Sequence, residues 1–428
     1  MTRPHARRSL PATVRRSPRL LAFLTVTLTT GLLAALLLLG RDLAGARKYG
    51  FTPVRSVFEA GLAAGFALYA LFVICWLLGG RRARLFLPLG ALAWWLGVER
   101  VVPPLLSYPF RPEQYDLIRD VDHWRKDMGG RQFNSDALRD TPESEAFHPG
   151  GLNLIVLGDS FAYGYGVKAA DSFPSQIRRI LRSDYPGRDL EVANFGWISS
   201  SPLLDYRRLQ AIGDRYRPQI VVLCVDMTDF SEDIRYQLML ERRGLYDLYD
   251  RFPLALAFFQ RLAPKTYQRL LAWSVGGMPV ERFFITEAPL AETRRWFEPL
   301  VFNLGRIEDW CHRRGADFVV VILPRAHQYS ARESPRNWEE REYTRRGPYS
   351  REPFRYFDEL RPRVAYPVVS LLPDFERSET FPLYLEDDPH WNAAGHRLAA
   401  EAILRAIRPF LERRLPPSAG RLSRSPSR

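Results

Sequence analysis

Ser160 stands where this chain is best suited to nucleophilic chemistry. It follows the apolar run Leu152–Leu157, which is typical of a strand buried on both faces in a parallel sheet. Gly158 ends that run, and an amphipathic helix pattern begins near Pro174. A serine on such a strand-to-helix turn exposes its hydroxyl among backbone N–H groups, as a nucleophile requires. The turn alone fits equally well a serine that only caps a helix.

A histidine flanked by carboxylates near the far end of the chain supplies a matching base. Asp387, Asp388 and His390 lie on one short turn, just before an amphipathic helix pattern that Asn392 can cap. At this spacing a carboxylate can orient the imidazole, which can then take a proton from a serine. His327 is the runner-up for the base, because it also follows the end of a predicted strand.

These segments together resemble the SGNH (GDSL-type) hydrolase superfamily. Gly158-Asp159-Ser160 matches its first block, Asn194-Phe195-Gly196 is similar to its second, and Asp387-x-x-His390 matches its last. The stretch Phe133–Asp140 is similar to the segment before the first strand in membrane-anchored and alginate-acetylation relatives. The resemblance covers roughly residues 131–411 and implies a three-layer α/β/α, flavodoxin-like fold with a parallel sheet.

The resemblance implies acyl transfer by a Ser–His–Asp triad. His390 would take the proton of Ser160, which attacks an ester carbonyl, while the N–H groups of Ser160 and Gly196 bind the oxyanion. Asp387 has the Asp-x-x-His spacing of the broad family, and Asp388 has the Asp-x-His spacing of the alginate-acetylation relatives. We favour Asp387 slightly as the orienting group. No metal or nucleotide cofactor is implied.

The third block of the superfamily is altered in this chain. Its pattern is Gly-x-Asn-Asp, in which the Asn side chain donates to the oxyanion, but here Thr228 stands at the Asn position, followed by Asp229. Loss of one oxyanion donor typically lowers turnover about 100- to 1000-fold. Either Thr228 or a backbone group replaces the amide, or the enzyme is weak, or the fold has lost its chemistry.

The positive charge of the chain is unevenly distributed. Its 428 residues carry a formal net charge of +13, and arginines crowd residues 1–19, the stretch 81–84 and the C-terminal end. We interpret this charge as membrane topology and a solvated tail, not as a nucleic-acid-binding surface. Cys75, Cys224 and Cys311 have neither disulfide nor metal-site spacing and are expected to be buried free thiols.

Apolar stretches near the N-terminus predict a membrane region over residues 20–106. Segments 20–40 and 60–80 are long enough to span a bilayer, which takes about 20 apolar residues. The third candidate, 85–106, contains Pro88, and its short apolar core also fits an interfacial or buried helix. A cleavable signal peptide is the alternative for the first stretch, but its apolar part is too long and further spans follow.

The positive-inside rule orients these segments. The tail 1–19 and the loop 81–84 carry nine arginines and are placed in the cytoplasm. Three spans put everything after residue 106 outside the inner membrane, whereas two spans leave it in the cytoplasm. We favour three spans, with the lipid bilayer as a partner and the catalytic domain in the periplasm.

Beyond the membrane region the chain reads as one α/β domain with extensions. A linker is expected over 107–150, the hydrolase-like domain over 151–412 and a disordered tail over 413–428. Residues 230–291 are too long for an ordinary connection and are expected to form a helix pair packed on the sheet or a lid near the site. Strands are predicted at 152–157, 190–194, 219–225, 318–323 and 366–371, and helices at 173–184, 202–216, 292–314 and 393–413.

Three functions are compatible with the sequence. The first is a membrane-anchored serine esterase that removes acyl groups, by resemblance acetyl groups, from cell-envelope carbohydrate or a small ester. The second is an O-acetyltransferase of the same fold, acting on a polysaccharide with a membrane acyl-transfer partner. The third is a weak or inactive envelope scaffold, which the altered third block favours. None of them involves nucleic acid.

Overall fold

The fold is seen in a computed structural model that describes residues 133–249, 252, 256, 259, 263–337, 339 and 347–415. The predicted tail 1–19 and the membrane segments of 20–106 lie outside these residues. Among the helices that are described, none is both long enough and apolar enough to cross a membrane. The chain divides into two compact units, and the sheet and the site belong to the unit Gln114–Asp247 with Ala263–Arg428.

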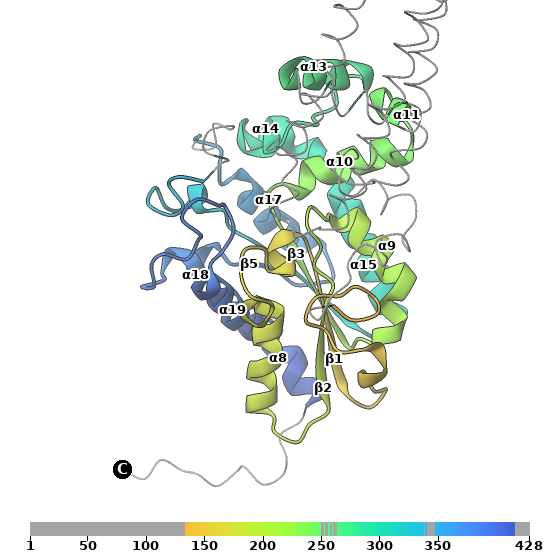
Figure 1. Cartoon of the computed structure of the whole chain (residues 1–428), viewed down its shortest axis with the longest axis vertical. Coiled ribbons are helices and arrows are strands. Elements are labelled where there is room, and N and C mark those ends of the chain that lie inside the picture. The colour runs from red at the N-terminus through yellow and green to blue at the C-terminus, as the bar shows by residue number, and fades with distance from the viewer. Residues whose placement is uncertain are drawn as a thin grey trace, which may run out of the picture. The chain divides into compact units, whose positions relative to one another are not determined.

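Five parallel strands form one sheet in the order β2-β1-β3-β4-β5 (Figure 1). Their bounds are β1 Leu152–Leu157, β2 Leu190–Asn194, β3 Ile220–Val225, β4 Asp317–Ile322 and β5 Val368–Ser370. Every residue of β1 and β3 is buried, which explains why both strands are continuous apolar runs. The predicted α/β architecture with a parallel sheet is therefore confirmed, and the strand expected over 366–371 is shorter than predicted.

Helices fill the connections between the strands. The α-helices are α7 Ser160–Tyr163, α8 Phe173–Asp184, α9 Pro202–Ile212, α10 Asp229–Leu240, α11 Leu245–Tyr249, α13 Pro264–Ser274, α14 Leu290–Thr293, α15 Glu298–His312, α17 Glu352–Leu360, α18 Leu372–Glu376 and α19 Ala393–Arg414. Short 3-10 turns are η2 Ser144–Ala146, η3 Ala169–Asp171, η4 Gly213–Tyr216, η5 Phe284–Thr286, η6 Arg294–Phe297, η7 Ala326–Gln328 and η8 Arg361–Arg363. The single helix predicted over 292–314 is divided, since Pro299 fits the first turn of α15 but not a helix interior.

Two hydrophobic cores lie on opposite faces of the sheet. Alternate residues of β1 point to opposite sides, so that Leu154 and Val156 belong to one core and Ile155 and Leu157 to the other. The first core is closed by α8, α18 and α19, and the second by α9, α10, α15 and α17 (Figure 1). The chain thus has the three-layer arrangement expected from its sequence.

The carboxyl ends of the central strands bring polar residues to one edge of the sheet. Ser160 follows β1, Gly196 follows β2, Thr228 follows β3 and Arg325 follows β4. In an open parallel sheet this edge is where ligands bind. The short turn that carries His390 immediately precedes α19, which packs against α8 on the sheet face.

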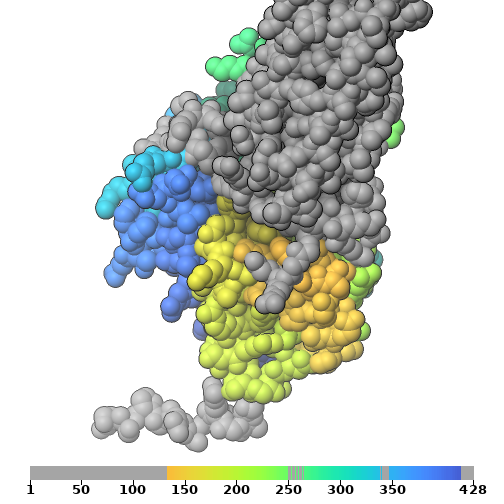
Figure 2. Space-filling view, viewed as in Figure 1, coloured from red at the N-terminus to blue at the C-terminus, as the bar shows by residue number. Residues whose placement is uncertain are grey.

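The described end of the predicted linker is packed against the α/β unit. Ala137, Leu138 and Phe147 are buried in the second core. The hydroxyl of Thr141 accepts a hydrogen bond from the backbone N–H of Asn194 at the end of β2, with 2.9 Å between the atoms. Figure 2 shows residues 133–150 lying against the segment that follows β1. From Phe133 onward the chain is therefore part of the α/β unit.

The side chain of His396, in the first turn of α19, is buried in the hydrophobic core. It is fully buried between Phe173 and Trp391, and its Nδ1 accepts the backbone N–H of Phe173 at 3.3 Å. Burial, with smaller contributions from the charges of His390 and Arg139, lowers the pKa of His396 to about 3. The folded protein therefore holds this imidazole neutral.

A neutral buried His396 should make the protein sensitive to mild acid. The unfolded chain binds this proton near pH 6.5, whereas the folded chain binds it only near pH 3. The contribution of the neutral imidazole to the free energy of unfolding is therefore fully present above pH 6.5 and is lost as the pH drops below that value. Between pH 7 and pH 5 the wild type should lose about 2 kcal/mol of unfolding free energy that His396→Leu does not lose. Urea titrations at both pH values measure this difference. His312→Gln, on the exposed end of α15, is the control that should keep the wild-type slope; equal slopes in all three proteins would contradict the assignment.

Candidate active site

A tight turn after β1 presents Ser160. Gly158 has φ of +139°, and a Cβ there would lie 2.9 Å from the carbonyl oxygen of Cys224, so glycine is required. Asp159 caps α7 by accepting the backbone N–H of Phe161 at 2.9 Å. Ser160 is the first residue of α7, and its backbone N–H consequently has no acceptor within the helix.

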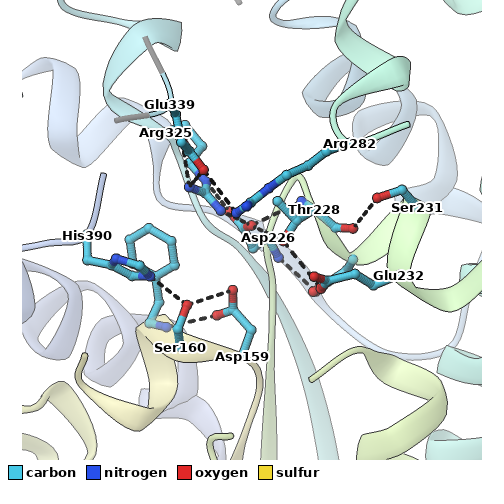
Figure 3. Close-up of polar contacts among 12 residues, drawn as sticks. Asp159, Ser160, Asp226, Thr228, Ser231, Glu232, Arg282, Arg325, Glu339 and His390 are labelled. Atoms are coloured by element: carbon cyan, nitrogen blue, oxygen red, sulfur yellow. Dashed lines mark hydrogen bonds and ion pairs between the residues drawn. The ribbon is translucent and has the colours of Figure 1, made fainter. Parts of the chain in front are cut away.

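The structure brings His390 to Ser160 across 230 positions of sequence. Ser160 Oγ lies 2.6 Å from His390 Nε2, and His390 Nδ1 is hydrogen-bonded to Asp388 Oδ1 (Figure 3 shows the first contact). A neutral imidazole that donates from Nδ1 to Asp388 can accept the serine hydroxyl at Nε2. Ser160 and His390 are only 7% and 9% exposed, so the pair meets in a mostly enclosed place.

Asp388, not Asp387, is the carboxylate that the structure places on the imidazole. We favoured Asp387 slightly from the sequence, but its side chain is exposed, whereas Asp388 is buried. The local backbone explains the difference. Asp388 Oδ1 also accepts the backbone N–H of His390 at 3.2 Å. This hydrogen bond closes a local turn and holds the carboxylate of Asp388 beside the imidazole of His390.

His327, the alternative base, lies elsewhere at the sheet edge. It belongs to η7, its ring packs 6.1 Å from that of Phe283, and it lines an open pocket together with Tyr329 and Arg351. The imidazole in contact with Ser160 is that of His390.

Gly196 was predicted to donate its N–H to an oxyanion, but that N–H is already engaged. It donates to Asn194 Oδ1 at 2.9 Å within the turn after β2. The need for glycine here has another reason: a Cβ would lie 2.2 Å from the backbone nitrogen of Tyr163 in α7. The turn after β2 therefore packs directly against the turn that carries Ser160.

Thr228 was the predicted replacement for the missing amide, and it too has other partners. Its hydroxyl donates to Asp226 Oδ2 at 2.7 Å, and its backbone N–H donates to the same oxygen at 3.0 Å. Asp226 can hold Thr228 in this way because it is fixed by Arg325, whose Nε donates to Asp226 Oδ1 at 2.7 Å. Of the three predicted oxyanion donors, the N–H of Ser160 is the one the observed conformation leaves available.

A buried ionic cluster lies beside Ser160 (Figure 3). Arg325 is 1% exposed and pairs with both Asp226 and Glu339, and Arg282 binds the same Oε1 of Glu339 at 2.9 Å. Burial alone would raise the pKa of Asp226, but the charge and hydrogen bonds of Arg325 outweigh it and hold that pKa below its usual value. Sequence reasoning missed Arg325, although it follows the end of β4 as Ser160 follows β1.

Asp159 has the opposite electrostatic environment. Burial, and next the negative charge of Asp226, raise its pKa well above the usual value, an effect that Arg325 opposes only in part. The raised pKa favours the uncharged form of Asp159, which is a poor proton acceptor, and its Oδ2 is 3.4 Å from Ser160 Oγ. His390 Nε2, at 2.6 Å, is the group better placed to accept a proton from Ser160 Oγ.

Arg139 holds the carboxyl end of the serine turn. One guanidinium nitrogen donates to the carbonyls of Tyr163 at 3.0 Å and Gly164 at 2.6 Å, and another donates to that of Val167 at 2.8 Å. Arg139 belongs to the stretch Phe133–Asp140 singled out in the sequence. The arginine satisfies carbonyls that the very short α7 leaves without helical partners.

Metal-binding residues are not gathered at this site. Within the described ranges, no group of three or more His, Cys, Asp or Glu side chains is arranged to hold an ion. Cys224 and Cys311 are buried free thiols, as predicted. The chemistry that the arrangement can support is proton transfer from Ser160 to His390 and nucleophilic attack by the serine oxygen.

Comparisons with known proteins give structural matches alone. No protein-family model and no curated protein matches the chain. TesA is 15% identical and matches 61% of this chain and 99% of its own, with a TM-score of 0.33. The psychrotrophic esterase EstA from Pseudoalteromonas sp. is 15% identical over 61% and 99%, with a TM-score of 0.34. A catalytic mutant of Axe2, an acetylxylan esterase from Geobacillus stearothermophilus, is 13% identical over 60% and 94%, with a TM-score of 0.35. Similarity this low carries no conclusion about function, which has to be argued from the residues themselves.

The two neighbouring aspartates provide a matched test of the site. Asp388→Asn should slow reaction of Ser160 with a serine-directed phosphonate about 10⁴-fold, because the imidazole loses the group that fixes its tautomer. Asp387→Asn, which removes the same charge one residue away, should react at the wild-type rate. Inactivation rates followed by intact-protein mass spectrometry measure both effects. Equal losses in the two variants would contradict the assignment of Asp388.

Proposed function

We propose that the protein is a serine esterase of the SGNH (GDSL-type) superfamily that cleaves acyl esters. The observation that carries this proposal is the continuous contact from Ser160 Oγ to His390 Nε2 at 2.6 Å and from Nδ1 to Asp388, at the carboxyl edge of a parallel sheet. The first and last blocks of the superfamily resemblance meet at this contact. Asp388 has the spacing of the alginate-acetylation relatives.

The reaction would proceed through an acyl-enzyme. His390 Nε2 takes the hydroxyl proton as Ser160 Oγ bonds to the ester carbonyl carbon, and Asp388 stabilises the imidazolium that forms. The imidazolium then gives its proton to the leaving alcohol oxygen as the carbon–oxygen bond breaks. Water next attacks the acyl carbon as His390 takes a proton from it, and the imidazolium returns this proton to Ser160 Oγ as the bond between that oxygen and the acyl carbon breaks.

The oxyanion donors are the unusual part of this mechanism. The N–H of Ser160 is available in the observed conformation, whereas Gly196 and Thr228 would first have to release Asn194 and Asp226. Catalytic hydrogen bonds often tighten only when substrate binds. With a single donor the enzyme would be slow, since each missing donor lowers turnover about 100- to 1000-fold.

A small acyl group such as acetyl fits the enclosed site best. Ser160 and His390 are each less than a tenth exposed, and the rings of Phe161 and Tyr165 lie 5.0 Å and 4.7 Å from that of His390. By resemblance the alcohol would belong to a cell-envelope carbohydrate. The same enclosure favours a second candidate function, an O-acetyltransferase, because that reaction requires water to be kept from the acyl-enzyme.

The esterase proposal predicts that removing the hydroxyl of Ser160 abolishes activity. Wild-type protein should hydrolyse a chromogenic acetyl ester faster than a butyryl ester, and Ser160→Ala should lower kcat about 10⁴-fold or more, because the nucleophile is gone. Ser183→Ala, on the exposed face of α8, should leave the rate unchanged. A phosphonate adduct located by peptide mass spectrometry should lie on Ser160.

The same assay separates the alternatives. If added unacetylated oligosaccharide acceptors accelerate consumption of the acetyl donor and become acetylated themselves, the protein is a transferase. If wild type and Ser160→Ala have equal rates and no adduct forms, the protein is a scaffold without this chemistry.

We further propose that predicted spans at 20–40, 60–80 and 85–106 anchor the enzyme in the inner membrane with its catalytic domain in the periplasm. The distribution of nine arginines over the tail 1–19 and the loop 81–84 supports this topology. A reporter active only in the periplasm should be active when fused after residue 120. Activity there of a reporter that works only in the cytoplasm would instead indicate two spans.

A further inference from the structure

The residues that carry His390 form a small hairpin, here called the histidine turn and comprising residues 383–392. Tyr384 and Trp391 form an isolated antiparallel bridge, and Leu385 donates its backbone N–H to the carbonyl of His390 at 2.9 Å. Such a short isolated hairpin has little stability of its own. Its geometry, and with it the position of Asp388, must be fixed by the residues packed around it.

A second stretch of chain, residues 330–337, holds this turn and is called the brace. Both carboxylate oxygens of Glu333 accept the backbone N–H of Leu383, at 2.9 Å and 3.1 Å, and one also accepts that of Tyr384 at 3.3 Å. Glu333 is 3% exposed. A carboxylate that accepts two adjacent backbone N–H groups fixes the first strand of the hairpin.

Ser334 makes the contact nearest to the chemistry. Its hydroxyl donates to the backbone carbonyl of Asp388 at 2.7 Å, and Ser334 is only 2% exposed. Asp388 is thus held twice: its carbonyl by Ser334, and its carboxylate by the backbone N–H and ring of His390. Rotation of the backbone at Asp388 would break the first contact and move the carboxylate away from the imidazole.

The backbone of Ser334 indicates that this contact is imposed by its surroundings. Ser334 has φ of +47°, a left-handed conformation that non-glycine residues rarely adopt. Its carbonyl accepts hydrogen bonds from Asn337, from Nδ2 at 2.6 Å and from the backbone N–H at 3.2 Å. Strained residues persist where the surrounding structure determines them, and they cluster at functional sites.

We propose that Glu333 and Ser334 are positioning residues, which hold Asp388 against His390 and so tune the triad. This inference rests on the proposed function. Neither side chain contacts Ser160 or the imidazole in the described contacts; Ser334 acts through the carbonyl of Asp388, and Glu333 acts through the strand that precedes it. The brace therefore matters to the rate through the orientation of one carboxylate.

Ser334→Gly tests this role without straining the fold, because glycine adopts the left-handed conformation readily. We expect kcat for acetyl-ester hydrolysis to fall about 10-fold with KM unchanged, the size of effect that one hydrogen bond can have. The acid limb of the pH profile of kcat/KM should move to lower pH, since a misplaced carboxylate stabilises the imidazolium less. Ser378→Gly, whose hydroxyl binds the backbone of a surface loop, is the matched control and should change neither quantity.

A double-mutant cycle tests whether Ser334 affects the reaction rate through Asp388. In an Asp388→Asn background, Ser334→Gly should cause no further loss in the rate of phosphonate labelling, because the carboxylate it orients is gone. An equal loss in both backgrounds, or no loss in the wild type, would overturn the positioning role. Thermal unfolding of each variant identifies any loss caused by unfolding, and Glu333→Gln, which retains one acceptor oxygen, should lower kcat less than Glu333→Ala does.

The two proposals fail in different ways. A wild-type protein that neither hydrolyses esters nor reacts with phosphonate would exclude the proposed function. An active wild type with an unaffected Ser334→Gly variant would exclude only the brace.

Discussion

The hydrogen bond between Ser160 and His390 depends on a constraint of parallel sheets, namely that strands running the same way end at the same edge. The serine turn follows β1 directly, and the histidine turn is brought to it by the packing of α19 on α8. Two segments 230 positions apart therefore meet with 2.6 Å between Ser160 Oγ and His390 Nε2. The close contact of Gly196 with α7, the clamp formed by Arg139 and the hydrogen bonds of the brace all serve to hold these turns in register.

Charge is arranged asymmetrically around this contact. Asp226 is kept ionised by Arg325, while Asp159, which is nearer to the serine, is driven toward its neutral form by burial and by the charge of Asp226. The hydroxyl of Thr228 donates to the ionised Asp226, at the position where the superfamily resemblance implies an oxyanion donor.

The sequence predicted what residue patterns encode and missed what depends on backbone geometry and on hydrogen-bond partners. Buried strands such as β1 and β3 are recognisable in the sequence as apolar runs, and Ser160 and His390 lie at turns that the sequence also indicates. The choice between Asp387 and Asp388 depends on backbone angles within a hairpin, which spacing does not specify. Likewise, the occupied N–H of Gly196 depends on a neighbouring side chain, and the pairing of Arg325 with Glu339 depends on the path of a long connection. The membrane segments lie outside the described residues and remain predictions.

The direct packing of the turn after β2 on α7 has a consequence for how this site can vary. A Cβ added at position 196 would lie only 2.2 Å from the backbone nitrogen of Tyr163. The turn after β2 and α7 are therefore in van der Waals contact, and no side chain fits between them. A larger residue at position 196 would displace Ser160 unless the turn after β2 moved away by a matching amount. The length of the chain is therefore freer to change in the insertion between β3 and β4 and in the connections beyond it, where residues can be added without moving Ser160.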